Sequence, residues 1–210
     1  DAGCRAAVME VTSHGLALDR VYGIAYDVAV FTNLTRDHLD YHKTPEAYLA
    51  AKALLFDNLS SDAHAVVNVD DPSTDALLQE CSANILGYGQ SKNAAVRILD
   101  GQTSWRDTTL SLQIPGGKLD LELALQGNFQ LYNATAAASV GLALDIAPEV
   151  IANAMREVRV PGRFEGIDCG QNFGVFVDYA HAPDGLKNVL QTAREFTEGK
   201  LFCVFGCGGD

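Results

Sequence analysis

The sequence predicts an α/β protein with a mostly parallel sheet, helices on it and a small antiparallel sheet. Short apolar runs alternate with helical segments and end in polar residues, as buried parallel strands and their crossover helices do. Between residues 95 and 125 the pattern changes to alternating apolar and polar residues around Pro115-Gly-Gly. That pattern indicates an antiparallel hairpin attached to the larger sheet.

Two early apolar runs end in residues that suit a metal site. Residues 6–14 are expected to form a strand with Glu10 near its carboxyl end, and residues 28–31 form the next strand. A polar series that includes His38 follows the second strand. Because the carboxyl ends of parallel strands meet at one edge of a sheet, we expect Glu10 and His38 at the same edge. A carboxylate is a usual Mg²⁺ ligand and an imidazole is a less usual but workable one.

The following segment predicts an amphipathic helix that carries a lysine on its apolar face. Thr44 is the expected N-cap and Pro45 lies in the first turn, after which apolar residues recur up to Leu59. Lys52 falls on that stripe. A buried ammonium must be paired, deprotonated or chemically modified, whereas a lysine at the edge of the stripe extends its amine to water. The residues alone leave these two interpretations even.

Strands and helices continue to alternate along the rest of the chain. Strands are expected at residues 64–70, 84–89, 171–184 and 200–205, and helices at residues 74–81, 134–144, 148–158 and 185–197. Asn133 precedes the helix expected at residues 134–144, and it is either the cap of that helix or an amide that reads a base edge. The last strand, helix and strand begin a second α/β unit, so we expect domains at residues 1–167 and 168–210.

The composition excludes several classes of protein. The 210 residues carry a formal net charge of −12, which argues against a nucleic-acid-binding surface. No apolar run reaches the roughly 18 residues of a membrane span. The five cysteines are an odd number without C-x-x-C spacing, so we expect reduced thiols in a cytoplasmic protein. The negative net charge is still compatible with an anionic small substrate, provided that a metal ion and a few arginines make the binding site locally positive.

Six motifs in order resemble the Mur ligases. They are Met9-Glu-Val-Thr-Ser-His-Gly-Leu, Phe31-Thr-Asn-Leu-Thr-Arg-Asp-His-Leu-Asp-Tyr-His, Ala50-Ala-Lys-Ala-Leu-Leu-Phe, Gly127-Asn-Phe-Gln-Leu-Tyr-Asn, Val160-Pro-Gly-Arg-Phe-Glu and Val177-Asp-Tyr-Ala-His-Ala-Pro-Asp. Together they look closest to the branch that adds the third residue of the peptidoglycan stem peptide, and the second and sixth strings favour peptidoglycan synthesis over the related folylpolyglutamate and cyanophycin synthetases. The resemblance implies the central ATP-binding domain of that family and the start of its C-terminal Rossmann-like domain.

By this resemblance the protein is an ATP-dependent amide ligase that uses ATP and Mg²⁺. It would add diaminopimelate or lysine to UDP-MurNAc-L-Ala-D-Glu through an acyl phosphate, as a monomer without a nucleic-acid or membrane partner. The family's phosphate loop, G-x-x-G-K-[ST], is absent from these 210 residues and is expected upstream. We therefore expect the 210 residues to be a fragment that is inactive alone.

The resemblance also implies roles for individual residues. The magnesium ligands and catalytic residues would be Glu10, His38 and Lys52, the last as a carbamylated lysine. Thr12 and Arg20 would contact the UDP-muramoyl substrate. The ATP contacts would be Asn133 at the adenine, Arg163 at the phosphates and Asp178 at the ribose. Two positions depart from the family pattern, namely Leu18, where glutamine is frequent, and Gln130, where asparagine is commoner.

Other functions share parts of this pattern. Folylpolyglutamate and cyanophycin synthetases share the Asp-His pair and the buried lysine. A magnesium-dependent nucleotide hydrolase or kinase would use Glu10 and His38 but gives no reason for Lys52 in the helix stripe. A non-catalytic binding module is compatible with each motif singly but not with six together. We interpret His14, His42 and His64 as structural or surface histidines.

Overall fold

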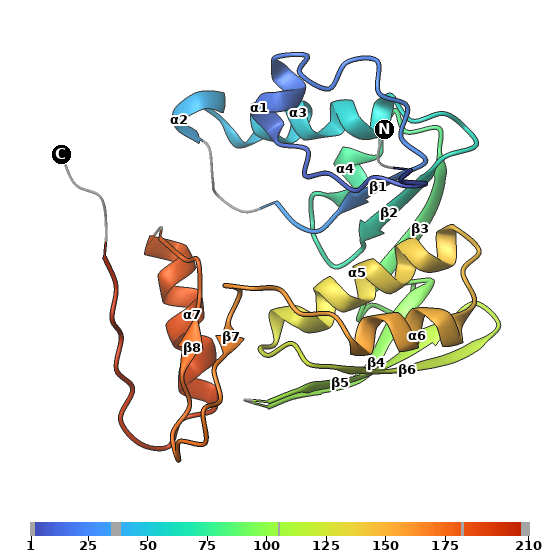
Figure 1. Cartoon of the computed structure of the whole chain (residues 1–210). Helices are drawn as coiled ribbons and strands as arrows, with labels where there is room; N and C mark the ends of the chain where they lie inside the picture. Colours follow the sequence, from blue (N-terminus) through green and yellow to red (C-terminus); the bar gives the residue numbers. More distant parts are fainter. Residues whose placement is uncertain (1–2, 35–38, 105, 182, 207–210) are drawn as a thin grey trace. The chain divides into compact units, whose positions relative to one another are not determined.

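The structure is a computed structural model that describes residues 3–34, 39–104, 106–181 and 183–206. Six strands form a mixed sheet in the order β1-β2-β3-β4-β5-β6, and β7 and β8 form a second, two-stranded sheet (Figure 1). The chain divides into two compact units, Asp1–Gly87 and Tyr88–Asp210. The predicted α/β fold, with parallel strands and an antiparallel extension, is confirmed.

The first unit is built on a parallel pair of strands. β1 (Val28–Phe31) runs parallel to β2 (His64–Asn68), with Val28 opposite His64. The core of this unit includes Phe31 of β1 and Phe56, whose rings meet edge to face at 6.4 Å between centroids. β3 (Asn84–Gly89) follows, and its last two residues pair in parallel with the first two of β4 (Val96–Thr103).

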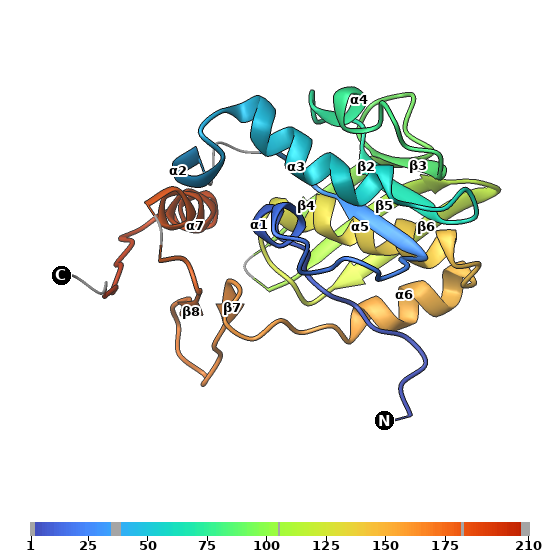
Figure 2. The ribbon, with the colours of Figure 1, turned by 90° about the horizontal axis from the view of Figure 1, so that it is seen from above.

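The helices of the first unit are α1 (Ser13–Ala17), α2 (Leu39–His42), α3 (Pro45–Asp57) and α4 (Thr74–Leu77). α1 and α2 pack against α3, and α1 lies beside it in two views (Figures 1 and 2). Thr44 Oγ1 accepts a hydrogen bond from the Ala47 N–H at 3.2 Å, and Pro45 lies in the first turn. The predicted start of this helix is confirmed.

Two predicted strands are wrong. Residues 3–12 and 201–206 have no strand structure, and Val8 and Val204 are fully exposed. An apolar run becomes a strand only where a neighbouring strand accepts its backbone hydrogen bonds, and neither run has such a partner among the described residues. At the end of the first run, the Gly15 N–H donates instead to Thr12 Oγ1 at 3.0 Å, and this bond starts α1.

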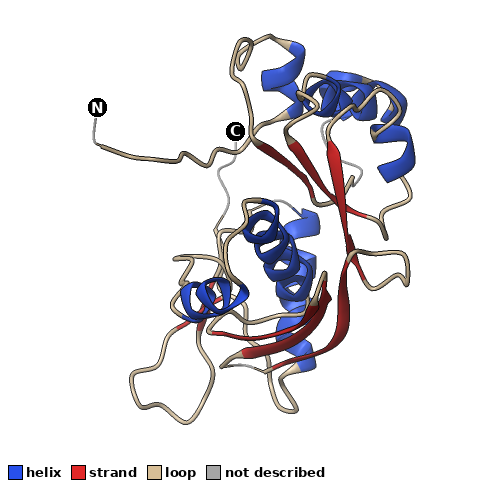
Figure 3. Ribbon diagram, turned by 90° about the vertical axis from the view of Figure 1, so that its right-hand side faces the viewer, coloured by secondary structure: helices blue, strands red, loops and turns tan. Residues whose placement is uncertain are grey.

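In the second unit, a three-stranded antiparallel meander carries two helices. β4 (Val96–Thr103), β5 (Thr108–Ile114) and β6 (Gly117–Leu123) pair in succession, as the alternating pattern predicts. Opposed leucines such as Leu112 and Leu119 are buried on one face. α5 (Phe129–Ala143) and α6 (Pro148–Arg156) pack on this sheet (Figures 1 and 3).

The two helices approach closely at a glycine. A Cβ atom on Gly141 of α5 would lie 2.7 Å from Cδ1 and 2.9 Å from Cγ1 of Ile151 in α6. Such distances are shorter than van der Waals contact, so α6 lies where it does because position 141 has no side chain. Ile151 is buried in this contact.

The last part of the chain is a short hairpin and a helix. β7 (Glu165–Gly166) pairs antiparallel with β8 (Phe176–Val177), and α7 (Pro183–Glu195) follows. The strand expected over residues 171–184 is thus reduced to two residues. Asn128 Nδ2 donates to Glu195 Oε2 at 2.6 Å, which ties α7 to the start of α5. Among the described helices, none combines the length and apolarity that crossing a membrane requires.

Candidate functional site

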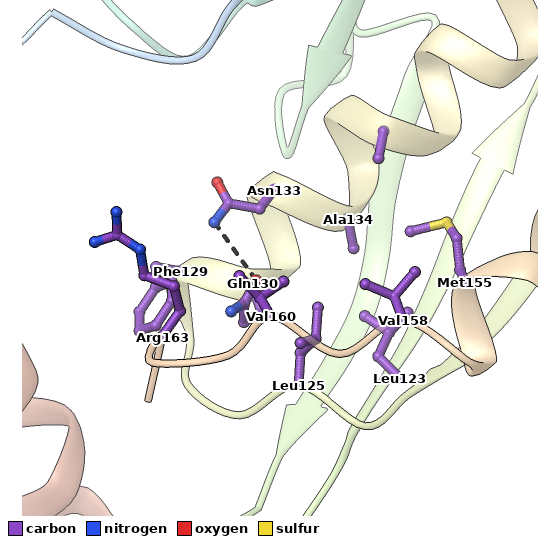
Figure 4. A pocket seen from close by; sticks show the side chains of 11 residues that line it. Leu123, Leu125, Phe129, Gln130, Asn133, Ala134, Met155, Val158, Val160 and Arg163 are labelled. Carbon is purple, nitrogen blue, oxygen red and sulfur yellow. Dashed lines mark hydrogen bonds between the residues drawn. The ribbon is translucent and has the colours of Figure 1, made fainter. Parts of the chain in front are cut away.

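A pocket of about 470 Å³ lies in the second unit between α5, α6 and the segment that follows α6. Most of its lining is apolar, and its polar members come from α5 and from the turn at residue 163 (Figure 4). The lining residues are Leu123, Leu125, Phe129, Gln130, Asn133, Ala134, Ala137, Met155, Val158, Val160 and Arg163. Two residues predicted to contact ATP, Asn133 and Arg163, therefore line one pocket.

Asn133 lies inside α5, so it does not cap that helix. α5 begins at Phe129, and its N-cap residue is Asn128. The Asn133 side chain is exposed and its Nδ2 donates to Gln130 Oε1 at 3.5 Å (Figure 4). The helix-cap interpretation is wrong because the helix starts a turn earlier than the alanine-rich stretch suggested. The amide of Asn133 faces the pocket with hydrogen-bonding capacity left over.

Gln130 is a pocket residue to which the motifs gave no role. It is only 5% exposed and lies one helical turn before Asn133. Residues three apart on a helix share a face, so this spacing is the sequence signal that identifies it. Its side-chain Oε1 accepts a long hydrogen bond from Asn133 Nδ2, at 3.5 Å, so the two amides lie together at the pocket.

Arg163 projects from a tight turn between α6 and β7. Its N–H donates to Val160 O at 3.2 Å, and its neighbours Gly162 and Phe164 have φ values of +69° and +48°. The Arg163 side chain is exposed, and its Cζ lies 4.9 Å from the centroid of the Tyr179 ring. That distance is within the range of a cation–π contact.

Asp178 borders the same turn from the end of β8. Its Oδ2 accepts from the Phe164 N–H and its Oδ1 from the Ala180 N–H, each at 2.7 Å. Asp178 is half-buried and is not part of the pocket lining. The structure therefore places Asp178 next to the backbone that carries Arg163.

The predicted substrate residues of the first unit lie around α1. Thr12 and Arg20 are exposed, as is Glu10. Thr12 Oγ1 caps α1, and the Arg20 N–H donates to Gly15 O at 2.8 Å. The three residues thus come from the segment that enters and leaves one short helix.

Lys52 lies at the margin of the buried face of α3. It is half-buried, and its Nζ lies 5.2 Å from the ring centroid of Tyr48, which is buried. The Tyr48 ring packs against His42 at 5.3 Å, and His42 Nε2 is hydrogen-bonded to Ser13 Oγ at 2.9 Å. This chain of contacts links α1, α2 and α3, and it gives His42 the structural role predicted for it.

The predicted metal site is only partly within the described residues. His38 lies outside them. Among the described residues, no group of three or more His, Cys, Asp or Glu side chains gathers as a metal site would. The ligand set of Glu10, His38 and Lys52 therefore stays a prediction.

Two family models together match most of the chain. Residues 1–141 match the Mur ligase middle domain, and residues 162–210 match the Mur ligase glutamate ligase domain. The chain belongs to the Mur ligase family. The resemblance of the six motifs to this family is thereby confirmed.

Curated Mur ligases resemble this chain along its whole length. The UDP-N-acetylmuramoyl-L-alanyl-D-glutamate–2,6-diaminopimelate ligase of Bacillus licheniformis is 46% identical over 217 residues, which cover 100% of this chain and 44% of the relative. The ligase of the same name from Thermosynechococcus vestitus is 46% identical over 214 residues, covering 100% of this chain and 43% of the relative. The chain spans less than half the length of these relatives.

Solved structures of Mur ligases share the fold. A UDP-N-acetylmuramoyl-L-alanyl-D-glutamate–2,6-diaminopimelate ligase superposes with a TM-score of 0.77 at 34% identity, covering 95% of this chain and 42% of that one. A MurF ligase from Thermotoga maritima in complex with ADP has a TM-score of 0.71 at 20% identity, covering 89% of this chain and 43% of that one. At that identity the second likeness shows the fold alone.

Proposed function

We propose that this Mur ligase couples ATP to amide formation and adds diaminopimelate to UDP-MurNAc-L-Ala-D-Glu. The observation that carries the proposal is that Asn133 and Arg163, two residues of separate motifs, line the same pocket. The names of the similar relatives favour diaminopimelate over lysine as the added amino acid. UDP-MurNAc-dipeptide and an amino acid are then its substrates.

The pocket suits the nucleoside part of ATP. Its apolar walls can pack on the faces of a purine, and the Asn133 amide at its edge can hydrogen-bond to the base. The exposed guanidinium of Arg163 suits the phosphates, because its fork of donors matches phosphate oxygens. Each Asp178 oxygen accepts one backbone N–H and retains a lone pair for a ribose hydroxyl.

The chemistry follows from the substrate. A carboxylate is a poor electrophile, and phosphorylation of the D-glutamate side chain by ATP turns one oxygen into part of a leaving group. The amine of the incoming amino acid then attacks the acyl carbon and phosphate leaves. In this scheme Arg163 stabilises charge on the transferring phosphoryl group.

Thr12 and Arg20 are proposed to hold the muramoyl substrate. Thr12 Oγ1 already accepts the Gly15 N–H, so its own O–H remains to donate to a substrate oxygen. Arg20 is exposed and offers a cation to an anionic group of the substrate.

Magnesium belongs to the proposal, with Glu10, His38 and Lys52 as its ligands. Glu10 offers an exposed carboxylate, and a half-buried Lys52 amine converted to a carbamate would offer a second anionic oxygen. When bound, Mg²⁺ would neutralise charge on the phosphates. We further propose domains at residues 1–167 and 168–210, and a monomer that acts in the cytoplasm.

The test is a phosphate-release assay on the full-length protein that contains this chain. We expect release that requires ATP, UDP-MurNAc-L-Ala-D-Glu and diaminopimelate together, with a much lower rate when lysine replaces diaminopimelate. Release without any amine would instead indicate a nucleotide hydrolase. Activity with a folate and glutamate but not with the muramoyl dipeptide would indicate a folylpolyglutamate synthetase.

A further inference from the structure

The turn that carries Arg163 is fastened on both sides to one short segment. The Phe164 N–H donates to Asp178 Oδ2, and the Tyr179 N–H donates to Gly162 O, each at 2.7 Å. These two bonds flank Arg163 and tie its turn to residues 178 and 179. The Gly162 N–H also donates to Glu165 Oε2 at 2.7 Å, which closes the turn on itself.

The backbone of this turn is held in an uncommon conformation by packing. Phe164 has a φ of +48°, in a region that a residue with a Cβ adopts at a cost. Its side chain is fully buried and stacks on Phe176, with ring centroids 4.5 Å apart and planes 13° from parallel. Burial of this ring offsets the backbone cost and fixes the point from which Arg163 projects.

Tyr179 contributes little to any core. Its side chain is 65% exposed, so burial of the ring does not explain its place. Its ring contacts are with the Arg163 guanidinium, at 4.9 Å from ring centroid to Cζ, and with His181, at 5.0 Å between centroids. The ring thus holds the charged end of a side chain whose backbone is already fixed by Asp178.

We propose that Tyr179 is a positioning residue that holds the Arg163 guanidinium ready for the phosphates of the nucleotide. A free arginine side chain loses rotamer freedom when it binds an anion, and a ring that restrains it beforehand reduces that loss. The aromatic face is the part of Tyr179 that this role needs, and the hydroxyl is not. The proposal rests on the proposed function, because it assumes that Arg163 binds nucleotide phosphates.

The test compares two tyrosine variants in the full-length protein, with ADP binding measured by calorimetry. Tyr179→Phe keeps the ring and is expected to bind ADP within twofold of the unmodified protein. Tyr179→Leu removes the ring and is expected to weaken ADP binding about twofold to fivefold, as expected for an exposed cation–π contact. Adenosine, which lacks phosphates, should bind all three proteins alike.

A double-mutant cycle with Arg163→Ala separates this role from a structural one. Arg163→Ala should weaken ADP binding about tenfold or more, and Tyr179→Leu should then have no further effect. If Tyr179→Leu weakens ADP binding equally with Arg163 present and with Arg163→Ala, the positioning role is overturned. The same holds if Tyr179→Leu weakens adenosine binding as much as ADP binding. Either result leaves the proposed contact of Arg163 with the phosphates intact. An unchanged ADP affinity in Arg163→Ala would overturn the proposed phosphate contact itself. Should Tyr179→Leu fail to fold, Tyr179→Gln replaces it in the cycle.

Discussion

Replacing Asn133 by alanine separates its possible roles in the helix and at the nucleotide. Asn133 lies inside α5, and its side chain makes one long hydrogen bond to Gln130, at 3.5 Å. A bond of that length adds little stability, and alanine favours a helix interior over asparagine by about 0.5 kcal/mol. The free energy of unfolding of Asn133→Ala should therefore stay the same or rise slightly.

The affinity for ADP, by contrast, should fall in the Asn133→Ala variant. Loss of one neutral hydrogen bond to the base is worth about 0.5–1.5 kcal/mol. At about 1.4 kcal/mol for each factor of ten, the Kd for ADP should rise about twofold to tenfold. The apolar walls of the pocket remain, so binding should weaken rather than disappear.

The assay pairs urea unfolding with calorimetric titration of ADP on the full-length protein. Asn153→Ala is the matched control, because Asn153 is an exposed asparagine inside α6 and does not line the pocket. The Asn153→Ala variant should show the same small gain in the free energy of unfolding, because alanine favours the helix, and its ADP affinity should be unchanged. If Asn133→Ala binds ADP as tightly as the control does, Asn133 does not read the base and the nucleotide assignment of this pocket is refuted.

Four further changes have defined outcomes. Lys52→Ala should abolish most phosphate release, with partial rescue by a short carboxylate, and unchanged turnover would refute the carbamate. Glu10→Ala should raise the magnesium concentration needed for half-maximal activity in a metal titration. Thr44→Ala removes the cap of α3 and should lower the free energy of unfolding by about 1 kcal/mol in urea melts. Burial and then the nearby Glu80 raise the pKa of Asp57 above 3.8, so its ionisation destabilises the fold as pH rises past that value. Asp57 is also the last residue of α3, where a negative charge opposes the helix dipole at a cost of about 0.3–1 kcal/mol. The Asp57→Asn variant should therefore have a higher free energy of unfolding at pH 7, by about that amount. Thermal melts should show this gain vanish below about pH 3.8, where the carboxyl is protonated in both states.

The elements that could be predicted from sequence are those with local causes. The cap and proline at residues 44 and 45 start α3 by their own chemistry, and the alternation on either side of Pro115 makes a hairpin from neighbouring segments. Residues 6–14 share the apolar pattern of a strand, but pairing depends on a partner that the pattern itself cannot supply. A local pattern therefore predicts the preference of a segment, and tertiary pairing decides its state.

For the candidate site too, the sequence indicates individual residues better than their contacts in the folded chain. Motifs led to Asn133 and Arg163, and the structure brings both to one pocket. Gln130 and Tyr179 contact those two residues. The spacing of Gln130 from Asn133 on one helix is a sequence signal, whereas the contact between Tyr179 and Arg163 joins separate segments and is seen only in the folded chain. The ribose contact of Asp178 stays a prediction, and the structure shows a different role for its carboxylate, which accepts the Phe164 N–H next to Arg163.

The close contact of Gly141 with Ile151 has a consequence for the pocket beside α5 and α6. Met155 lies one turn beyond Ile151 on α6 and lines the pocket, so a shift of α6 away from α5 would move part of the pocket wall. A methyl group at position 141 would press on the Ile151 side chain, which must then change its rotamer or shift with its helix. A glycine outside the pocket lining can thus influence the shape of the proposed nucleotide pocket, and mutational libraries confined to the lining would overlook it.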